Sequence, residues 1–422
     1  MMKIFDLDVW QEIWVTITRN KLRSILTGFG VFWGIFMLVV LIGIGTGFEG
    51  GMRRNFEGVA SNACFFFSNR TSEPYKGYRK GRWWNMNNRD VKLIRERAES
   101  VEHISPILFG NSSDKNVVRG VKSGGYSVVG VYPAQFEIQK QIVLHGRLFN
   151  NLDIDEYRKI CVIGIEVYET LFSVGENPIG SYIRVNGIYF QVVGVITPVS
   201  ENVQMGSDAK QSVYIPFSTM QRAFNQGDII HFMSCTVKPG YSAKDTEMEV
   251  KTILKTSHDI SPTDEKAVNS FNTEEIFKMF DALFLGVSGL IWIVGIGALL
   301  SGIIGISNIM MVTVRERTRE IGVRRAIGAK PMSIMTQILS ESFVLTTLFG
   351  LFGLLTGLAL LALADNLLST GVIQIEIISS PIIPFFTAIV AMFILLISGI
   401  FAGLMPAFRA LKVKPIDAIR DE

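Results

Sequence analysis

The side chains best suited to recognition chemistry lie together in one segment, residues 313–331, which reads TVRERTREIGVRRAIGAKP. The segment holds six basic and two acidic side chains and lies between two long apolar runs. Arg pairs with carboxylates through a planar fork that Lys cannot copy, so a binding role of the segment would depend on its arginines and not on positive charge alone. Apolar residues alternate with the charges and predict a helix with one apolar edge, formed by Ile321, Val323, Ala326 and Ile327. Gly328 and Pro331 should end that helix.

The residue types that commonly perform catalysis form no comparable pattern. The 422 residues contain neither a G-x-S-x-G nucleophile elbow nor a G-x-x-x-x-G-K-[ST] phosphate-binding loop. The three cysteines allow one disulfide at most, and their strand-like surroundings favour buried thiols: Cys64, Cys161 and Cys235. The histidines are scattered without metal-ligand spacing: His103, His145, His231 and His258. We therefore expect binding rather than catalysis, with no metal or cofactor on this chain.

The elements that must position the basic segment are membrane spans. Apolar residues make up 48% of the chain and gather in four blocks whose centres lack Asp, Glu, Lys and Arg. These blocks are residues 24–47, 284–314, 338–364 and 382–406. A helix that crosses about 30 Å of hydrocarbon needs about 20 residues, which each block supplies. The sequence therefore predicts a membrane protein with a four-helix transmembrane bundle.

Positive charge beside the spans predicts their orientation. Lys and Arg in short loops stay cytoplasmic. They are present in residues 1–23, 315–337 and 407–422 but absent from the loop 365–381. We expect both termini and the basic segment in the cytoplasm, and residues 48–283 on the outer side of the membrane. Within residues 1–23, apolar side chains share one helical face and predict an interfacial helix: Phe5, Val9, Ile13 and Ile17.

The large outer segment, residues 48–283, reads as an α+β domain. Strand-like runs occur at residues 64–67, 117–120, 127–131, 231–237 and 267–271, and helix-like runs at residues 90–98 and 242–257. Its two flanking parts share a strand–helix–strand order, which suggests a pseudo-repeat. A β-rich insertion is expected between them at about residues 133–226. The aromatic surface candidates of the outer segment as a whole are Trp83–Trp84 and Phe65–Phe67.

Small residues at four-residue intervals predict close helix packing within the bundle. The pairs are Gly43/Gly47, Ala298/Gly302, Gly353/Gly357 and Gly399/Gly403. Apart from Glu341, the spans offer no ionisable group that could carry a coupling ion. Asn272 and Glu275 predict a capped helix start, so the second span should extend from about residue 272 as a stalk. The bundle therefore suits the transmission of motion rather than the use of an ion gradient.

The segment VRERTREIGVRRAIGAKP resembles the MacB-type, or macrolide-exporter, permeases of the FtsX-like ABC transporter superfamily. Further similar stretches follow in order along nearly the whole chain: NKLRSILTGFGVFWGI, GRLFNNLDI, NPIGSYIRVNGIYFQVVGVI, VYIPFSTMQ and PAFRALKVKPIDAIRDE. The resemblance implies a dimer whose protomers each have four spans and a periplasmic domain with porter-like and β-rich subdomains. It also implies a cytoplasmic coupling helix at residues 315–337 that docks onto an ABC ATPase. The residues that would carry this role are Arg315, Glu316, Arg317, Thr318, Arg319, Glu320, Ile321, Gly322, Arg324, Arg325, Ala326, Gly328 and Ala329.

One departure from the family concerns the ATPase. The macrolide exporter fuses its ATPase to the permease, whereas here only about 23 residues precede the first span and no phosphate-binding loop occurs. We therefore expect a separate ATPase chain, which would bind the ATP and magnesium. Other partners implied are membrane lipids, a second copy or a paralogous permease, and a periplasmic adaptor with an outer-membrane channel. No nucleic acid is expected.

The leading functional hypothesis is the permease subunit of an ABC efflux system that works by mechanotransmission. Its cargo would be a drug, peptide, lipid or lipoprotein, which the sequence does not distinguish. A second hypothesis is an FtsX-like signalling scaffold that regulates a periplasmic cell-wall enzyme. A third, from another class, is a membrane-anchored periplasmic enzyme, which the missing catalytic pattern disfavours.

Overall fold

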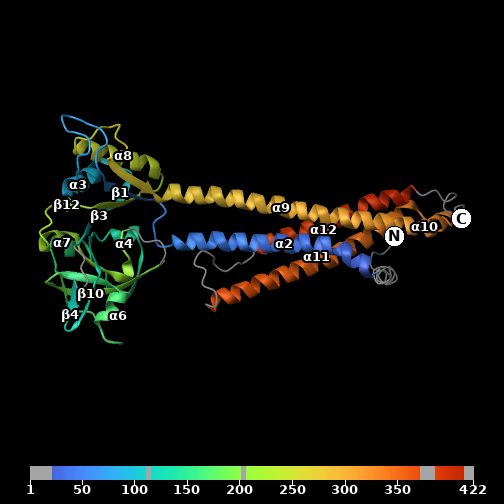
Figure 1. Cartoon of the computed structure of the whole chain (residues 1–422), viewed down its shortest axis with the longest axis horizontal. Helices are drawn as coiled ribbons and strands as arrows, with labels where there is room; N and C mark the ends of the chain where they lie inside the picture. The colour runs from blue at the N-terminus through green and yellow to red at the C-terminus, as the bar shows by residue number, and fades with distance from the viewer. Residues whose placement is uncertain (1–20, 111–115, 201–205, 371–384, 413–422) are drawn as a thin grey trace. The chain divides into compact units, whose positions relative to one another are not determined.

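The chain divides into two compact units, residues 1–53 with 283–422 and residues 54–282 (Figure 1). The computed structural model describes residues 21–110, 116–200, 206–370 and 385–412. The interfacial helix expected within residues 1–23, most of the loop expected at 365–381 and the end of the tail at 407–422 therefore lie outside the described residues.

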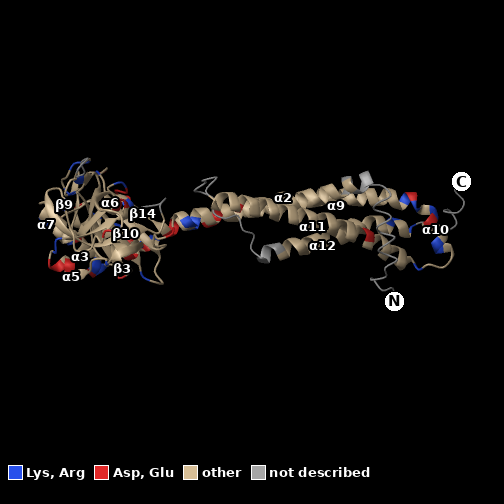
Figure 2. Ribbon diagram, turned by 90° about the horizontal axis from the view of Figure 1, so that it is seen from below, with Lys and Arg blue, Asp and Glu red and all other residues tan. Residues whose placement is uncertain are grey.

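Four helices in the described part are long and apolar enough to cross a membrane. They are α2 (Lys21–Asn55), α9 (Thr273–Glu316), α11 (Pro331–Ser369) and α12 (Phe385–Leu411). Figure 2 shows long stretches without charged residues along these helices. The expected fold class, a four-helix membrane bundle with a large α+β domain, is confirmed.

Helix α9 is continuous over 44 residues, which corresponds to about 66 Å at 1.5 Å per residue. It begins where the sequence predicts a cap, because the Asn272 side chain accepts a hydrogen bond of 2.7 Å from the Glu275 backbone N–H. The helix has no break through the region expected to be the stalk and the second span.

Small residues let the membrane helices approach one another closely. A Cβ atom at Gly353 of α11 would lie 2.5 Å from the carbonyl oxygen of Phe32 in α2, and one at Gly302 of α9 would lie 2.9 Å from the Gly30 backbone. Gly47 is buried. The other expected packing residues contact neighbouring helices as follows: Gly43 lies against Leu361, Ala298 against Gly34, Gly357 against Val39, Gly399 against Thr346 and Gly403 against Ser342. The pair Gly30/Gly34 has the same four-residue spacing but was missed by the sequence analysis.

The outer unit is built on one mixed sheet, which has twelve strands among the described residues, in the order β14-β1-β13-β3-β6-β11-β8-β10-β9-β4-β5, with β7 also paired to β10. The strands are β1 (Ala63–Ser68), β3 (Val101–Phe109), β4 (Val117–Arg119), β5 (Lys122–Gly124), β6 (Ser127–Val131), β7 (Gln141–Gly146), β8 (Ile160–Gly164), β9 (Tyr182–Val185), β10 (Ile188–Pro198), β11 (Ser212–Pro216), β13 (Phe232–Val237) and β14 (Val268–Asn272). A separate ribbon pairs β2 (Met86–Asn87) with β12 (Ile229–Ile230).

Helices flank this sheet and supply much of its buried core. They are α3 (Asn88–Arg97), α4 (Gln135–Ile138), α5 (Asn151–Asp155), α6 (Ile165–Leu171), α7 (Phe217–Ala223) and α8 (Ala243–Ser257), with a short 3-10 helix, η1 (Ala209–Gln211). Helices α3 and α8 bury Ile94 and Leu254 in the same core cluster as Phe66 of β1. The helices expected at 90–98 and 242–257 are thus confirmed as α3 and α8.

The pseudo-repeat is present, but its parts differ from the expected ones. β1–α3–β3 and β13–α8–β14 form two strand–helix–strand units whose strands interleave in the order β14-β1-β13-β3, a split βαβ arrangement. The predicted start of the insertion near residue 133 was wrong. The insertion begins directly after β3, because β4 leaves the repeat and pairs with β9. The apolar pattern of residues 101–109 did not predict strand β3.

The three cysteines are buried free thiols. Cys64 of β1 lies opposite Cys235 of β13 in the antiparallel register. The hydrogen bond with Cys235, followed by burial, raises the pKa of the Cys64 thiol, and burial raises the pKa of Cys161. Both thiols are therefore protonated and inert towards nucleophilic chemistry.

Candidate functional site

The basic segment forms a short helix, α10 (Thr318–Ala326), that follows α9 after one non-helical residue, Arg317. Its end is a Schellman motif. Gly328 has φ of +104°, its N–H donates to the Arg325 carbonyl at 3.1 Å, and the Ala329 N–H donates to the Arg324 carbonyl at 3.0 Å. Pro331 is then the first residue of α11. The predicted stop at Gly328 and Pro331 is confirmed, and residues 331–337 belong to the third membrane helix.

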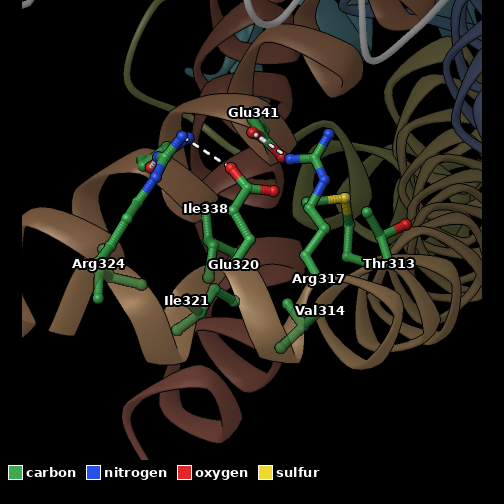
Figure 3. A pocket seen from close by; sticks show the side chains of 11 residues that line it. Thr313, Val314, Arg317, Glu320, Ile321, Arg324, Ile338 and Glu341 are labelled. Atoms are coloured by element: carbon green, nitrogen blue, oxygen red, sulfur yellow. Dashed lines mark hydrogen bonds and ion pairs between the residues drawn. The ribbon is translucent and has the colours of Figure 1, made fainter. Parts of the chain in front are cut away.

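An ion pair connects the start of α10 to α11. The Arg317 Nη1 atom lies 3.1 Å from Oε1 of Glu341, whose side chain is only 5% exposed. Figure 3 shows the Arg317 guanidinium directed at this carboxylate. A carboxylate so far from water requires a partner. Glu341, which stands alone in an apolar run of the sequence, is therefore the residue that receives Arg317.

Two further arginines attach α10 to its neighbours. Arg324 contacts Glu320, one turn earlier, at 2.7 Å and donates to the Gln337 side chain of α11 at 3.0 Å. Arg325 donates to the Leu411 carbonyl, at the end of α12, at 3.0 Å. Between these contacts remains a cavity of about 30 Å³ lined by residues of α9, α10 and α11 (Figure 3). It has room for water and not for an organic ligand, so α10 packs closely against its neighbours. We call the contacts of Arg317, Arg324 and Arg325 with Glu341, Gln337 and the Leu411 carbonyl the α10 joint.

The apolar residues of α10 do not form the single edge that the sequence predicted. Ile321 is 8% exposed and, like Gly322, is buried against the bundle. Val323 and Ile327 are 40% and 82% exposed, and Ala326 between them is exposed as well. These three residues have i, i+3, i+4 spacing and therefore share one helical face. We call Val323, Ala326 and Ile327, the C-cap residue that directly follows the helix, the outer face of α10.

The remaining predicted coupling residues surround this joint. Thr318 donates its hydroxyl to the Arg315 carbonyl at 2.8 Å and so bonds the last turn of α9. Ala329 is partly buried. Arg315, Glu316, Arg319 and Glu320 are exposed. The contacts of Gln337 and Leu411 with α10 were not predictable from the sequence, and Glu341 stands out there only as an isolated charge in an apolar run.

The outer unit contains a second charged cluster, which has a structural role. Asp153 is fully buried and accepts hydrogen bonds from Arg147 at 2.7 Å and Arg158 at 3.0 Å. Asn150 caps helix α5 in a reciprocal capping box with Asp153. Burial favours the neutral acid, but the Arg147 and Asn150 hydrogen bonds outweigh it and lower the pKa of Asp153. Arg147, Asn150 and Asp153 are three of the four polar residues of the GRLFNNLDI stretch, and their contacts connect the end of β7 to α5.

No group of His, Cys, Asp and Glu within the described ranges is arranged to hold a metal ion. The aromatic candidates also differ from one another. Phe65 and Phe66 are core residues with no exposed surface, Trp84 is 6% exposed and Trp83 is 60% exposed.

Comparison with known proteins agrees with this architecture. Residues 24–253 match the MacB-like periplasmic core domain, and residues 292–415 match the FtsX-like permease C-terminal domain. The chain is 30% identical over 420 residues to the pyoverdine export ATP-binding/permease protein PvdT of Pseudomonas putida, covering 98% of this chain and 59% of the relative. It is 28% identical over 433 residues to the macrolide export ATP-binding/permease protein MacB of Chlorobium luteolum, covering 99% of this chain and 62% of the relative.

Among solved structures, the periplasmic region of MacB from Actinobacillus actinomycetemcomitans matches with a TM-score of 0.43 and 21% identity, over 54% of this chain and 96% of that region. The chain spans about 60% of the length of the two curated relatives. The periplasmic core match alone covers more than half of the 422 residues. The chain therefore belongs to the MacB-like family of ABC transporter permeases, with a MacB-like periplasmic core and an FtsX-like permease domain.

Proposed function

We propose that this chain is the permease of an ABC exporter in which α10 couples ATP hydrolysis to movement of the outer unit. The observation that carries the proposal is the pair of faces on α10. Its inner side is fixed to α11 and α12 by Arg317, Arg324 and Arg325. Its outer face presents Val323 and Ile327 to solvent. A short helix that is anchored on one side and presents exposed apolar side chains on another suits docking of a partner domain.

The partner proposed for the outer face is the nucleotide-binding surface of an ABC ATPase that is not among these 422 residues and that binds ATP and magnesium. The names of the relatives, which include both an ATP-binding part and a permease, support this assignment. Displacement of α10 would move the end of α9, because one residue separates the two helices. Since α9 is continuous to Thr273, it can carry this displacement along its axis.

The proposed setting is a bacterial inner membrane with α10 and both termini in the cytoplasm and residues 48–283 in the periplasm. The family match to a periplasmic core domain and the positive charges beside the spans support this orientation. We propose a dimer, formed with a second copy or a paralogous permease, and recruitment of a periplasmic adaptor with an outer-membrane channel. The proposed activity is export of a small organic cargo, by analogy with the pyoverdine and macrolide export named for the relatives.

The test is to place a charge on the outer face of α10. Ile327→Asp should leave the chain inserted and folded, because residue 327 is 82% exposed and packs against little. It should weaken co-purification of the ATPase at least tenfold, as loss of an apolar anchor does in other interfaces. Val174→Asp is the matched control, since Val174 is fully exposed in the outer unit. Normal ATPase association and normal export by the Ile327→Asp variant would contradict the proposal.

A further inference from the structure

A basic hairpin projects from the outer unit between β1 and β2. We define it as residues 70–83, which read RTSEPYKGYRKGRW. Tyr75 and Tyr78 pair across a tight turn. At this turn Lys76 and Gly77 have φ values of 45° and 84°. Two successive residues with positive φ are the signature of a type I′ turn, which fits the twist of a hairpin. The segment therefore has a defined backbone although it contains little regular secondary structure.

A buried carboxylate fixes the base of the basic hairpin. Asp264 has no exposed surface. Its oxygens accept 2.7 Å hydrogen bonds from both the backbone N–H and the hydroxyl of Ser72, and a 3.2 Å bond from the Glu73 N–H. They also accept bonds of 3.1 Å from the N–H groups of Lys266 and Ala267. Hairpin and domain are thus bonded through one side chain.

The other strand of the basic hairpin is held at Arg82. Its guanidinium donates to the carbonyls of His258 at 2.5 Å and Asp259 at 3.1 Å, at the end of α8. The Thr71 N–H donates to the Arg82 carbonyl at 3.0 Å. The side chain of the neighbouring Trp84 is buried and donates to the Ala267 carbonyl at 3.1 Å. These bonds hold both ends of the segment in one conformation.

The tip and outer side of the basic hairpin carry unbalanced positive charge. Lys76 pairs with Asp259 at 2.7 Å, but Arg79 and Lys80 are exposed and make no ion pair with any described carboxylate. Arg70 is also exposed, and its guanidinium lies 5.8 Å from the ring of Trp83. The single acidic residue of the hairpin, Glu73, accepts a hydrogen bond from the Thr263 hydroxyl at 2.6 Å. Its charge lies at the base rather than near the tip.

Aromatic rings lie among these cations. Trp83 is 60% exposed and Tyr78 is 47% exposed. The Arg82 guanidinium lies 4.2 Å from the Tyr78 ring. Tyr, Trp and Arg are the side chains that most often dominate binding energy at protein interfaces. A surface that presents them on a fixed backbone loses little conformational entropy when it binds.

We propose that the basic hairpin is a docking site for an acidic segment of a partner protein. Its free cations complement carboxylates, and Arg79 can bind one through two parallel N–H donors. Its exposed rings supply apolar contact between the charges. An anionic membrane surface would attract the same charges without requiring a fixed backbone, whereas this hairpin is held at both ends. The fixed geometry therefore favours a protein partner.

The test measures binding of a fluorescein-labelled peptide of alternating Glu and Gly residues to the full chain in detergent. The wild-type chain should bind the peptide, and added salt should weaken the binding. Reversal of both free charges, Arg79→Glu with Lys80→Glu, should weaken it at least tenfold. The matched control is Lys92→Glu with Arg97→Glu on α3, where two exposed cations should change affinity by no more than about twofold. Trp83→Ala should weaken binding without any change in charge.

Three outcomes would overturn the proposal. The first is absence of peptide binding to the wild-type chain, and the second is equal loss of peptide binding in the α3 control. The third is preference for lipid, shown when vesicles of phosphatidylglycerol and phosphatidylcholine bind the wild-type chain but not the Arg79→Glu, Lys80→Glu variant and the peptide does not displace them. Thermal unfolding of the charge-reversal variant identifies any loss of folding. None is expected, because the Arg79 and Lys80 side chains are exposed and make no described ion pair.

Discussion

Two short basic segments of this molecule, α10 and the basic hairpin, look alike in the sequence but use their charges in opposite ways. In α10, three arginines bond to the neighbouring helices through Glu341, Gln337 and the Leu411 carbonyl. The surface left to solvent includes Val323 and Ile327. In the basic hairpin, the backbone is fixed mainly by a carboxylate from elsewhere in the domain, and several cations remain exposed.

The difference shows that positive charge in a sequence does not by itself mark a binding surface. An arginine that bonds to a neighbouring helix attaches its own helix to the fold, and a partner protein can then contact only the residues beside it. An exposed cation without an ion-pair partner, held on a fixed backbone, can itself bind a partner protein. The two segments should therefore respond differently to loss of their anchoring carboxylates, Asp264 and Glu341, and of their exposed charges.

The largest effect is expected from Asp264→Ala. This change removes the acceptor of five hydrogen bonds in a fully buried position. We expect the free energy of unfolding of the outer unit to fall by about 3 kcal/mol. Urea unfolding of the full chain, followed by tryptophan fluorescence, measures it in a background where the four tryptophans outside the outer unit are replaced by Phe, so that Trp83 and Trp84 give the signal. Asp228→Ala, at an exposed position, is the control and should change the value by less than about 0.5 kcal/mol.

Glu341→Ala should have a smaller but clear effect on α10. The ion pair with Arg317 is buried on one side and 28% exposed on the other, so its loss should cost about 2 kcal/mol. The joint would then open roughly 30 times more often. The opening is measured by maleimide labelling of Ile321→Cys, because residue 321 is buried and should react slowly unless α10 detaches. An unchanged labelling rate when Glu341→Ala is added to Ile321→Cys would show that the ion pair does not hold α10 in place. Arg315→Ala is the exposed control.

Acid should weaken the anchor of the basic hairpin. Burial opposes ionisation of Asp264, but its hydrogen bonds from Ser72, Glu73 and Lys266 prevail and hold its pKa below the usual value of 3.8. A carboxyl with a lower pKa in the folded state stabilises the fold above its unfolded pKa and loses this contribution as pH falls through the folded pKa. Stability should therefore be constant near neutral pH and decline below about pH 5. Asp264→Asn should be less stable near neutral pH and show a flatter acid dependence.

The smallest effect is expected from Glu320→Gln. Glu320 and Arg324 are 50% and 42% exposed and lie four residues apart on α10. Exposed pairs of this kind contribute about 0.5 kcal/mol or less. Labelling of Ile321→Cys should thus rise by no more than about twofold, while Arg324 keeps its bond to Gln337. A large increase would show that Glu320 also anchors α10, so that exposed and buried ion pairs would contribute similarly to holding this helix.

Much of the architecture was predictable because its signals are local. The four membrane helices follow from composition, the start of α9 from the Asn272 cap, and the end of α10 from Gly328, whose positive φ suits glycine. The two helices α3 and α8 follow from the periodicity of their apolar residues.

The orientation of individual side chains was less predictable, because it depends on contacts far along the chain. Ile321 and Val323 are close in sequence, yet only Ile321 is buried in the core cluster of the membrane helices. Trp83 and Trp84 are adjacent, and only Trp84 reaches the Ala267 carbonyl. The start of the insertion was misplaced for the same reason, since β4 pairs not only with the adjacent β5 but also with β9, a strand more than 60 residues away.

The pairing of strand β3 has a mechanical consequence for the outer unit. β3 bonds to β13 of the split βαβ part along one edge and to β6 of the insertion along the other. A rotation between these two parts would have to shear a continuous ladder of backbone hydrogen bonds rather than bend a linker. The outer unit should therefore move as one stiff plate, and amide hydrogens along β3 should be among the slowest in the protein to exchange with solvent.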